Sequence, residues 1–197
     1  MKNLWFATHN AHKIAEVERM LAPMGWAVRG IAEAGLTDEI EESGLTLTEN
    51  AQIKARYAYR HLGEPCISDD SGLEVDALGG QPGVHSARYA GEPRDNERNL
   101  RLLLSRLRGC DNRTAHFRTV ICMILADSEH YFEGRLDGSI TTEPRGSGGF
   151  GYDPVFRPYG HELTFAEMSP ELKNSLSHRA RAVASWLAFI KNAGGVE

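Results

Sequence analysis

The sequence of 197 residues predicts a mixed α/β fold in which helices flank a β-sheet. Near the N-terminus, an apolar strand, an amphipathic helix and a second strand at 26–31 follow one another, an order typical of parallel strands. Further on, the β-rich runs 114–126 and 129–142 flank Asp127-Ser128, a short connection typical of an antiparallel hairpin. Parallel and antiparallel pairs in one chain predict a mixed sheet.

The composition is that of an ordinary globular protein, with 41% hydrophobic and 25% charged residues. A chain of this length buries a sizeable core, so we expect one domain spanning 1–197. A formal net charge of -5 argues against a protein that binds nucleic acid by neutralising phosphates. No long apolar run suggests a membrane span. Three cysteines without metal-like spacing, and an N-terminus without signal-peptide layout, predict a cytoplasmic location.

The first expected strand, 2–8, ends in a polar turn that runs from Thr8 to Lys13 and opens a helix. Free backbone N–H groups and the helix dipole at such a start favour an anion such as phosphate. Lys13 lies in the first turn, where a cation is unfavourable for the helix alone, and this suggests a ligand. In the alternative interpretation, Asn10 merely caps the helix and Lys13 is solvated. The residues do not decide between the two.

An acidic loop containing Glu41 and Glu42 precedes the next helix, and most acidic runs of this kind are solvated surface. Thr46 and Glu49 form a capping-box pattern, which predicts that a helix starts there. Its apolar face contains Leu47, Ala51, Ala55, Ala58 and Leu62. Lys54 on this helix is either a surface charge or approaches the acidic stretch that follows.

The stretch 66–91 is the most informative part of the chain. A strand-like run at 65–68 leads into Asp69 and Asp70. Two adjacent carboxylates at the end of a buried strand are costly to desolvate unless a positive group shares the site. A Mg2+ ion meets this need, because it prefers a few carboxylate oxygens together with waters and substrate phosphates. The alternative is an acidic turn whose side chains cap the local backbone.

A second informative stretch is the glycine-rich loop at 145–154. Four of the six positions 146–151 are glycine, which permits close approach of the backbone to a ligand. Phe150 and Tyr152 could stack on a flat ring, and Asp153 could accept hydrogen bonds from ring N–H groups. The alternative is a structured turn whose aromatic side chains belong to the core.

Two helices are expected near the C-terminus. A short one starting at Ser169 contains Lys173, and Ser177 caps the last one. His178 and Arg179 then fall at the first positions of the last helix, facing whatever lies beyond its N-terminus. Without further context, a His-Arg pair at a helix start usually lies exposed on the protein surface.

Taken together and in this order, these segments resemble the inosine triphosphate pyrophosphatase family, enzymes that remove non-standard purine nucleoside triphosphates. The matching pieces are ATHNAHK (7–13), EESGLTLTENAQIKA (41–55), SDDSGLEVDALGGQPGVHSARYAG (68–91), GSGGFGYDPVF (146–156) and ELKNSLSHRA (171–180). They extend over nearly the full chain, and the third and fourth are specific. The departures are small: His9 stands where many members have Gly, and the region 109–114 is short.

The resemblance implies an elongated mixed sheet with two lobes and a substrate cleft between them, in a cytoplasmic homodimer. The implied reaction is the hydrolysis of ITP, dITP and XTP to the nucleoside monophosphate and pyrophosphate, with Mg2+ as cofactor. The partner is therefore a small-molecule purine nucleotide, with no role for nucleic acid or membrane.

The resemblance also implies roles for individual residues. Asp70 would be the catalytic carboxylate and a metal ligand, with Asp69 beside it and Glu41 or Glu42 completing the metal site. Phosphate contacts would come from the turn that comprises Thr8, His9, Asn10, Ala11, His12 and Lys13, and Ser71 would also touch substrate. The base pocket would be formed by Phe150, Gly151, Tyr152 and Asp153 and closed by Lys173, His178 and Arg179.

Two other interpretations stay open. Asp70-Ser71-Gly72 resembles the catalytic triplet of aspartic proteases, which need two such carboxylates, so a protease would have to be a dimer meeting at this loop. A non-catalytic nucleotide sensor would share the pocket without turnover. The adjacent Asp69 and Asp70 count against a sensor, because triphosphate binding alone requires no extra carboxylates near the phosphates.

Overall fold

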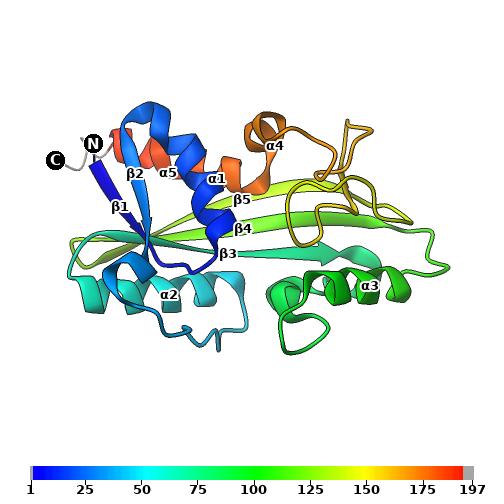
Figure 1. Cartoon of the computed structure of the whole chain (residues 1–197), viewed down its shortest axis with the longest axis horizontal. Helices are drawn as coiled ribbons and strands as arrows, with labels where there is room; N and C mark the ends of the chain where they lie inside the picture. Colours follow the sequence, from blue (N-terminus) through cyan, green and yellow to red (C-terminus); the bar gives the residue numbers. More distant parts are fainter. Residues whose placement is uncertain (1, 193–197) are drawn as a thin grey trace. The chain divides into compact units, whose positions relative to one another are not determined.

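The computed structural model describes residues 2–192, which contain a six-stranded sheet with strand order β2-β1-β3-β4-β5-β6 (Figure 1). The strands are β1 (Lys2–Phe6), β2 (Trp26–Gly30), β3 (Cys66–Val75), β4 (Thr114–Leu125), β5 (Ser128–Ile140) and β6 (Phe156–Pro158). Strand β1 pairs in parallel with both β2 and β3, whereas β5 and β6 are antiparallel. The prediction of a mixed sheet is therefore confirmed.

The α-helices are α1 (Ala11–Leu21), α2 (Leu47–Leu62), α3 (Asn96–Arg106), α4 (Pro170–Leu176) and α5 (His178–Asn192). Helix α2 starts with the predicted capping box: the Thr46 hydroxyl accepts from the Glu49 N–H, and the Glu49 carboxylate accepts from the Thr46 N–H. In the described part of the chain, no helix combines the length and the apolar character needed to cross a membrane.

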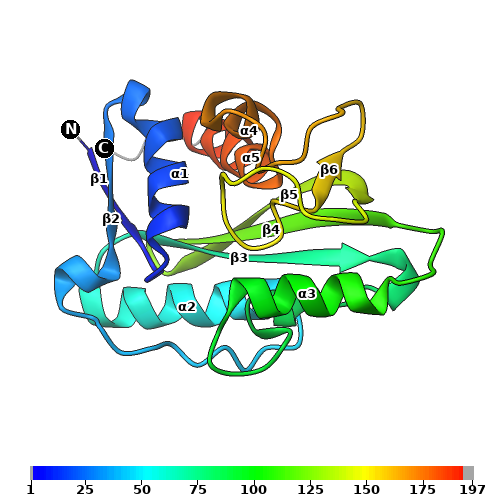
Figure 2. The same ribbon diagram turned by 45° about the vertical axis from the view of Figure 1, so that its right-hand side comes forward.

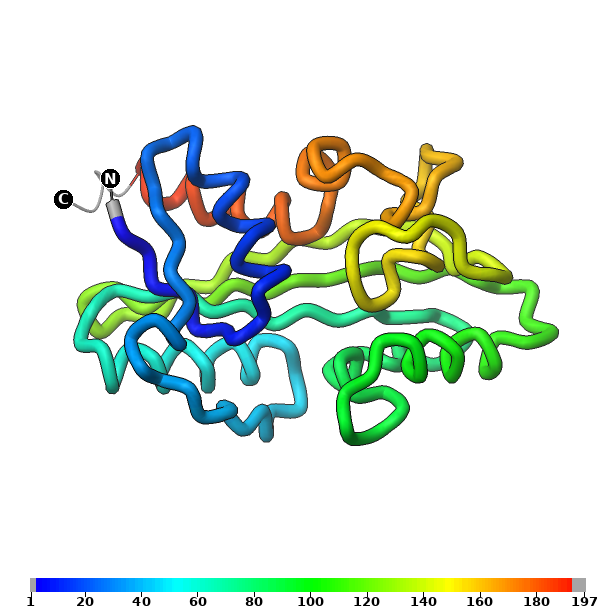
Figure 3. The backbone as a smooth tube through the Cα atoms, in the orientation of Figure 1, coloured from blue at the N-terminus to red at the C-terminus, as the bar shows by residue number. Residues whose placement is uncertain are grey.

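The chain forms two compact units and passes between them repeatedly (Figure 3). Of the described residues, the first unit contains 2–70, 119–134 and 179–192, and the second contains 71–118 and 135–178. Strands β3, β4 and β5 each contribute residues to both units. Neither unit is therefore a continuous segment of sequence.

In the first unit, α1 and α5 cover one face of the strands and α2 covers the other (Figures 1 and 2). Trp186 of α5 is fully buried and meets Trp26 edge-on, with 6.1 Å between ring centroids. The core on this face also contains Leu4, Phe6, Val17, Leu21, Ile67 and Val183. Under α2 the buried side chains are smaller and include Ala7, Ala58 and Cys66. Small side chains let α2 approach the strands closely, so its polar residues can reach β3.

The core of the second unit joins α3 to the sheet. Phe117 of β4 meets Phe156 of β6 edge-on, with ring centroids 4.6 Å apart. Other members are Leu73, Leu100, Leu103, Leu107 and Phe165. At Gly72 of β3, an added Cβ would lie 2.5 Å from the carbonyl oxygen of Gly83, so only glycine permits this close approach of a loop to the strand.

Two element boundaries differ from the prediction. Strand β3 does not end before the acidic pair but continues through Asp69 and Asp70 to Val75, so the alternative of an acidic turn is wrong. The hairpin connection is Ala126-Asp127, one residue earlier than predicted, with φ of 47° and 62°. Two consecutive residues in the left-handed region are typical of tight hairpins, because their twist matches that of the strands.

Candidate active site

The two adjacent carboxylates of β3 point to opposite faces of the sheet, because successive side chains of a strand alternate. Asp70 faces α2, as does Ser68, whose hydroxyl donates to the carbonyl of Ala51 in that helix. Asp69 instead faces cations from α1 and α5. Asp69 is 1% exposed and Asp70 is 7% exposed. The acidic pair therefore forms two separate clusters in the first unit.

In the Asp70 cluster, one lysine lies between two carboxylates. The Nζ atom of Lys54 is 3.2 Å from Asp70 Oδ1 and 2.6 Å from Glu42 Oε1. Asn50 donates through Nδ2 to Asp70 Oδ2 at 3.3 Å and accepts through Oδ1 from the N–H of Gly44 at 2.8 Å. Asn50 therefore ties the acidic loop to the strand. The interpretation in which Lys54 approaches the acidic stretch is confirmed.

Burial changes the proton affinity of this cluster. It raises the pKa of Asp70, and the attraction of Lys54 does not cancel the effect. Burial by itself would lower the pKa of Lys54, but Asp70 and Glu42 together raise it above its ordinary value. A carboxylate of raised pKa accepts a proton more readily than an exposed one, so Asp70 has the chemistry of a general base.

In the Asp69 cluster, both carboxylate oxygens face cations. Lys13 Nζ lies 2.8 Å from Oδ1, and Arg179 Nη2 lies 3.3 Å from Oδ2. Arg179 also donates through Nη1 to Glu16 of α1. Burial alone would raise the pKa of Asp69, but Lys13 and Arg179 hold it well below its ordinary value. Burial lowers the pKa of Lys13 against the attraction of Asp69. Asp69 is therefore the counter-charge of two cations, the partly buried Lys13 and the buried Arg179.

The N-terminus of α1 is capped by the side chain of Asn10. Asn10 Oδ1 accepts from the N–H groups of His12 and Lys13 at 3.0 and 3.2 Å, and the Thr8 hydroxyl accepts from the N–H of Asn10 at 3.1 Å. Part of the predicted anion-binding N–H set is thus already used, and the capping role of Asn10 is confirmed. Lys13 is not solvated, because it pairs with a buried carboxylate. The exposed residues of this turn are His9, Ala11 and His12.

The second unit contains most of the residues predicted to meet the base. Lys173 donates to Asp153 Oδ2 at 2.8 Å, and the same oxygen accepts from the N–H of Phe150 at 2.7 Å. The Lys173 ammonium lies 4.9 Å from the ring centroid of Phe150, within range of a cation–π interaction. A Cβ at Gly149 would collide with the Asp153 carboxylate. The glycine-rich loop therefore closes around Asp153, which positions Lys173.

Two other predicted base-pocket residues, Tyr152 and His178, are buried. Tyr152 is 4% exposed and its hydroxyl donates to the carbonyl of Ser86 at 2.9 Å, so for this residue the alternative of a core aromatic is confirmed. The His178 ring is also buried and stacks on Phe117 with 4.6 Å between centroids. Partly buried positions are Ser71, Phe150 and Gly151.

The four carboxylates predicted as metal ligands do not form one group. Asp69 faces its own two cations, Glu41 is exposed, and Glu42 and Asp70 converge on the ammonium of Lys54. Within residues 2–192, no group of three or more His, Cys, Asp or Glu side chains is arranged to hold a metal ion. Two carboxylates that converge on a cation still fit Mg2+, which usually takes one or two from a protein and completes its coordination with water and substrate phosphates.

Arg179, for which the resemblance implies a role at the base, makes its ion pairs with residues of the first unit. Its side chain is 2% exposed and belongs to the first unit, because it reaches from the first turn of α5 to Asp69 and Glu16. Sequence reasoning also missed Glu16 and Asn50. Both interrupt the buried face of an amphipathic helix, where a polar residue needs a partner, and that interruption is the signal that would have found them.

The solved structure of the Staphylococcus aureus Ham1 protein is similar to this chain, with a TM-score of 0.87 and 38% identity, covering 98% of this chain and 100% of that one. A dITP/XTP pyrophosphatase of Porphyromonas gingivalis is 50% identical over 191 residues, 96% of this chain and 98% of the relative. One from Bacillus subtilis is 45% identical over 93% of this chain and 94% of the relative. The Ham1 family model matches residues 4–189. The chain belongs to the Ham1 family, and the resemblance seen in the sequence is confirmed.

We expect Asp69→Asn to destabilise the protein most near neutral pH. Because folding lowers the Asp69 pKa, its stabilisation is fully present above the unfolded-state pKa of about 3.9 and is lost as pH falls through the lower folded value. Breaking a buried ion pair costs about 3–5 kcal/mol, so urea unfolding near neutral pH should show a loss of this size. Between about pH 5 and 3 the difference in free energy of unfolding between Asp69→Asn and wild type should become smaller.

The matched control is Asp38→Asn, which removes an exposed carboxylate of the same unit. Its free energy of unfolding should follow that of wild type at every pH. A difference between Asp69→Asn and wild type that is constant from neutral to acidic pH would contradict an ionised Asp69 held by two cations.

Proposed function

We propose that this chain hydrolyses dITP, ITP and XTP to the nucleoside monophosphate and pyrophosphate. The observation that supports this most directly is the Asp70 cluster, in which a buried carboxylate of raised pKa shares one lysine with Glu42. The relatives named dITP/XTP pyrophosphatases support the same reaction. A cytoplasmic homodimer, as the sequence resemblance implies, is part of the proposal.

Asp70 is assigned the role of general base. It would take a proton from the water that attacks the α-phosphorus, while the bond from that phosphorus to the bridging oxygen breaks and pyrophosphate leaves. Asn50 holds one carboxylate oxygen of Asp70, so the orientation of the base is fixed by α2. The hydrolase of the aspartic protease type is disfavoured, because Asp70-Ser71-Gly72 lies inside β3 and not in a loop where two copies could meet.

Glu42 and Asp70 are the residues that would hold Mg2+, and Glu41 is left out because it is exposed. When bound, the ion would supply positive charge to neutralise the triphosphate. Lys13 would add a second charge at the phosphates, held in place by Asp69. The phosphate contacts of this proposal therefore belong to the first unit.

The base would be recognised by residues of the second unit. Hypoxanthine and xanthine carry a 6-oxo group where adenine carries an amine. A fixed hydrogen-bond donor can donate to the 6-oxo group, whereas the adenine amine offers it no acceptor. Lys173 is such a donor, because Asp153 orients its ammonium. A site that hydrogen-bonds a required group discriminates by several orders of magnitude. Arg179 is not assigned to the base, because its guanidinium binds Asp69 and Glu16.

The decisive assay incubates the wild-type protein with Mg2+ and either dITP or GTP and measures pyrophosphate and phosphate separately. We expect pyrophosphate from dITP and little product from GTP. Phosphate as the first product would move the attack to a terminal phosphorus and remove Asp70 from its role. Binding of dITP without any product would favour the nucleotide sensor.

We expect Asp70→Asn to lower kcat for dITP by about 100-fold or more, since it removes the proposed general base. Circular dichroism should show a folded protein. The matched control is Asp76→Asn, an exposed carboxylate six positions along the same chain, which should keep wild-type kcat. Pyrophosphate release by Asp70→Asn at a near-normal rate would assign the base to another group.

Substitutions of the adjacent residues Glu41 and Glu42 provide a matched pair of variants that tests the proposed metal site. We expect Glu42→Gln to raise the Mg2+ concentration for half-maximal activity by about tenfold or more, because it removes one of two converging carboxylates. Glu41→Gln removes the same charge from an exposed position and should leave the Mg2+ dependence unchanged. The reverse ranking would transfer the ligand role to Glu41.

A further inference from the structure

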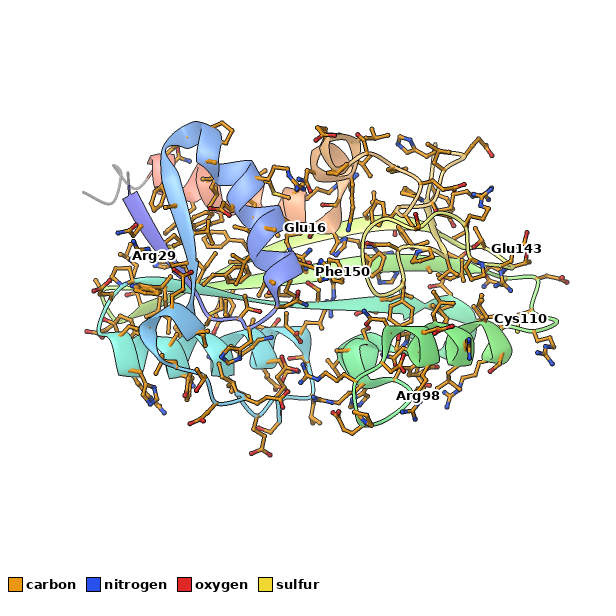
Figure 4. All side chains as sticks on the ribbon, in the orientation of Figure 1. Glu16, Arg29, Arg98, Cys110, Glu143 and Phe150 are labelled. Carbon is orange, nitrogen blue, oxygen red and sulfur yellow. The ribbon has the colours of Figure 1, made fainter. Side chains whose placement is uncertain are left out.

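Four charged side chains of the first unit, three of them buried and Lys13 partly buried, are linked into a ring by three ion pairs and the backbone of α1. Lys13 pairs with Asp69, Asp69 with Arg179, and Arg179 with Glu16. Glu16 lies on α1 (Figure 4), three residues after Lys13 and therefore on the same face of the helix. This charge ring, Lys13, Glu16, Asp69 and Arg179, thus begins and ends on one helix.

The charge ring is neutral, since two cations balance two carboxylates. Asp69 is 1% exposed, Arg179 2% and Glu16 9%, so little water can replace a missing partner. Removing one member of a buried ion pair leaves an uncompensated charge, which is strongly unfavourable. Each ring member therefore restricts where the others can lie.

The geometry at Asp69 is unusual for an arginine–carboxylate pair. A guanidinium commonly binds both oxygens of a carboxylate through two parallel hydrogen bonds. Here Arg179 directs both Nε and Nη2 to Oδ2, each at 3.3 Å, and Lys13 holds Oδ1 at 2.8 Å. The third nitrogen, Nη1, donates to Glu16. Glu16 thus holds the guanidinium in an orientation that leaves one oxygen of Asp69 to the lysine.

We propose that Glu16 is a positioning residue for Lys13. By holding Arg179, it keeps Asp69 Oδ1 available to the Lys13 ammonium and so fixes the position of a phosphate-binding charge. Without Glu16, the guanidinium is free to bind both oxygens of Asp69 and displace the lysine. The inference rests on the proposed function in one respect, that Lys13 meets the phosphates of the substrate.

The test measures the affinity of inorganic tripolyphosphate by calorimetry, without added metal, so that it does not depend on turnover. We expect Glu16→Gln to weaken binding by about tenfold, because a small displacement of a positioned group has an effect of this order or larger. Glu18→Gln removes the same charge from an exposed position of α1 and should bind as wild type does. With dITP, Glu16→Gln should raise KM and leave kcat nearly unchanged, since the lost contact is made equally in the ground and transition states.

A double-mutant cycle separates positioning from a general loss of structure. If Glu16 acts through Lys13, Glu16→Gln should have almost no further effect on tripolyphosphate affinity in a Lys13→Met background. An equal loss in both backgrounds would overturn the proposal. If Glu16→Gln does not fold, Glu16→Asp, which keeps the charge on a shorter side chain, takes its place in the same cycle.

The two proposals fail in different ways. A wild-type protein that binds tripolyphosphate but releases no pyrophosphate from dITP would overturn the proposed function and leave the positioning role standing. Tripolyphosphate affinity of Glu16→Gln equal to that of Glu18→Gln, in a protein that does hydrolyse dITP, would overturn the positioning role alone.

Discussion

The burial of two consecutive carboxylates in one strand is the constraint on which the first unit depends. Alternation along β3 sends Asp69 and Asp70 to opposite faces, so each face must supply its own positive charge. On one face α2 supplies Lys54, and on the other α1 and α5 supply Lys13 and Arg179. The helices are therefore held to the sheet by charge as well as by apolar packing.

Much of the fold follows from local sequence patterns. The capping box at Thr46, the serine cap at Ser169 and the β-α-β order were readable because each depends on neighbours within a few residues. The length of β3 could not be predicted from the sequence, because carboxylates disfavour a buried strand unless partners stabilise them. Those partners are distant in sequence: Lys13 lies 56 residues from Asp69, and Arg179 lies 110.

The same limit applies to the site. The sequence and its family resemblance indicated a lysine, two acids and a glycine-rich loop as candidates, but they did not distinguish Glu41 from Glu42. The choice depends on the path of the acidic loop, which Asn50 fixes by accepting from the Gly44 N–H. The ion pair of Arg179 with Asp69 was not predicted for a related reason: position at a helix start does not show how far a long side chain reaches back toward the sheet.

The order of the chain has a consequence for how the protein folds during synthesis. Arg179 comes from the last helix, and its contact with Glu16 spans 163 residues. A nascent chain that lacks α5 can therefore pair Asp69 with Lys13 but lacks the guanidinium that binds the other carboxylate oxygen. Because contacts of such separation form late, the ion pairs around Asp69 are completed only after α5 has left the ribosome.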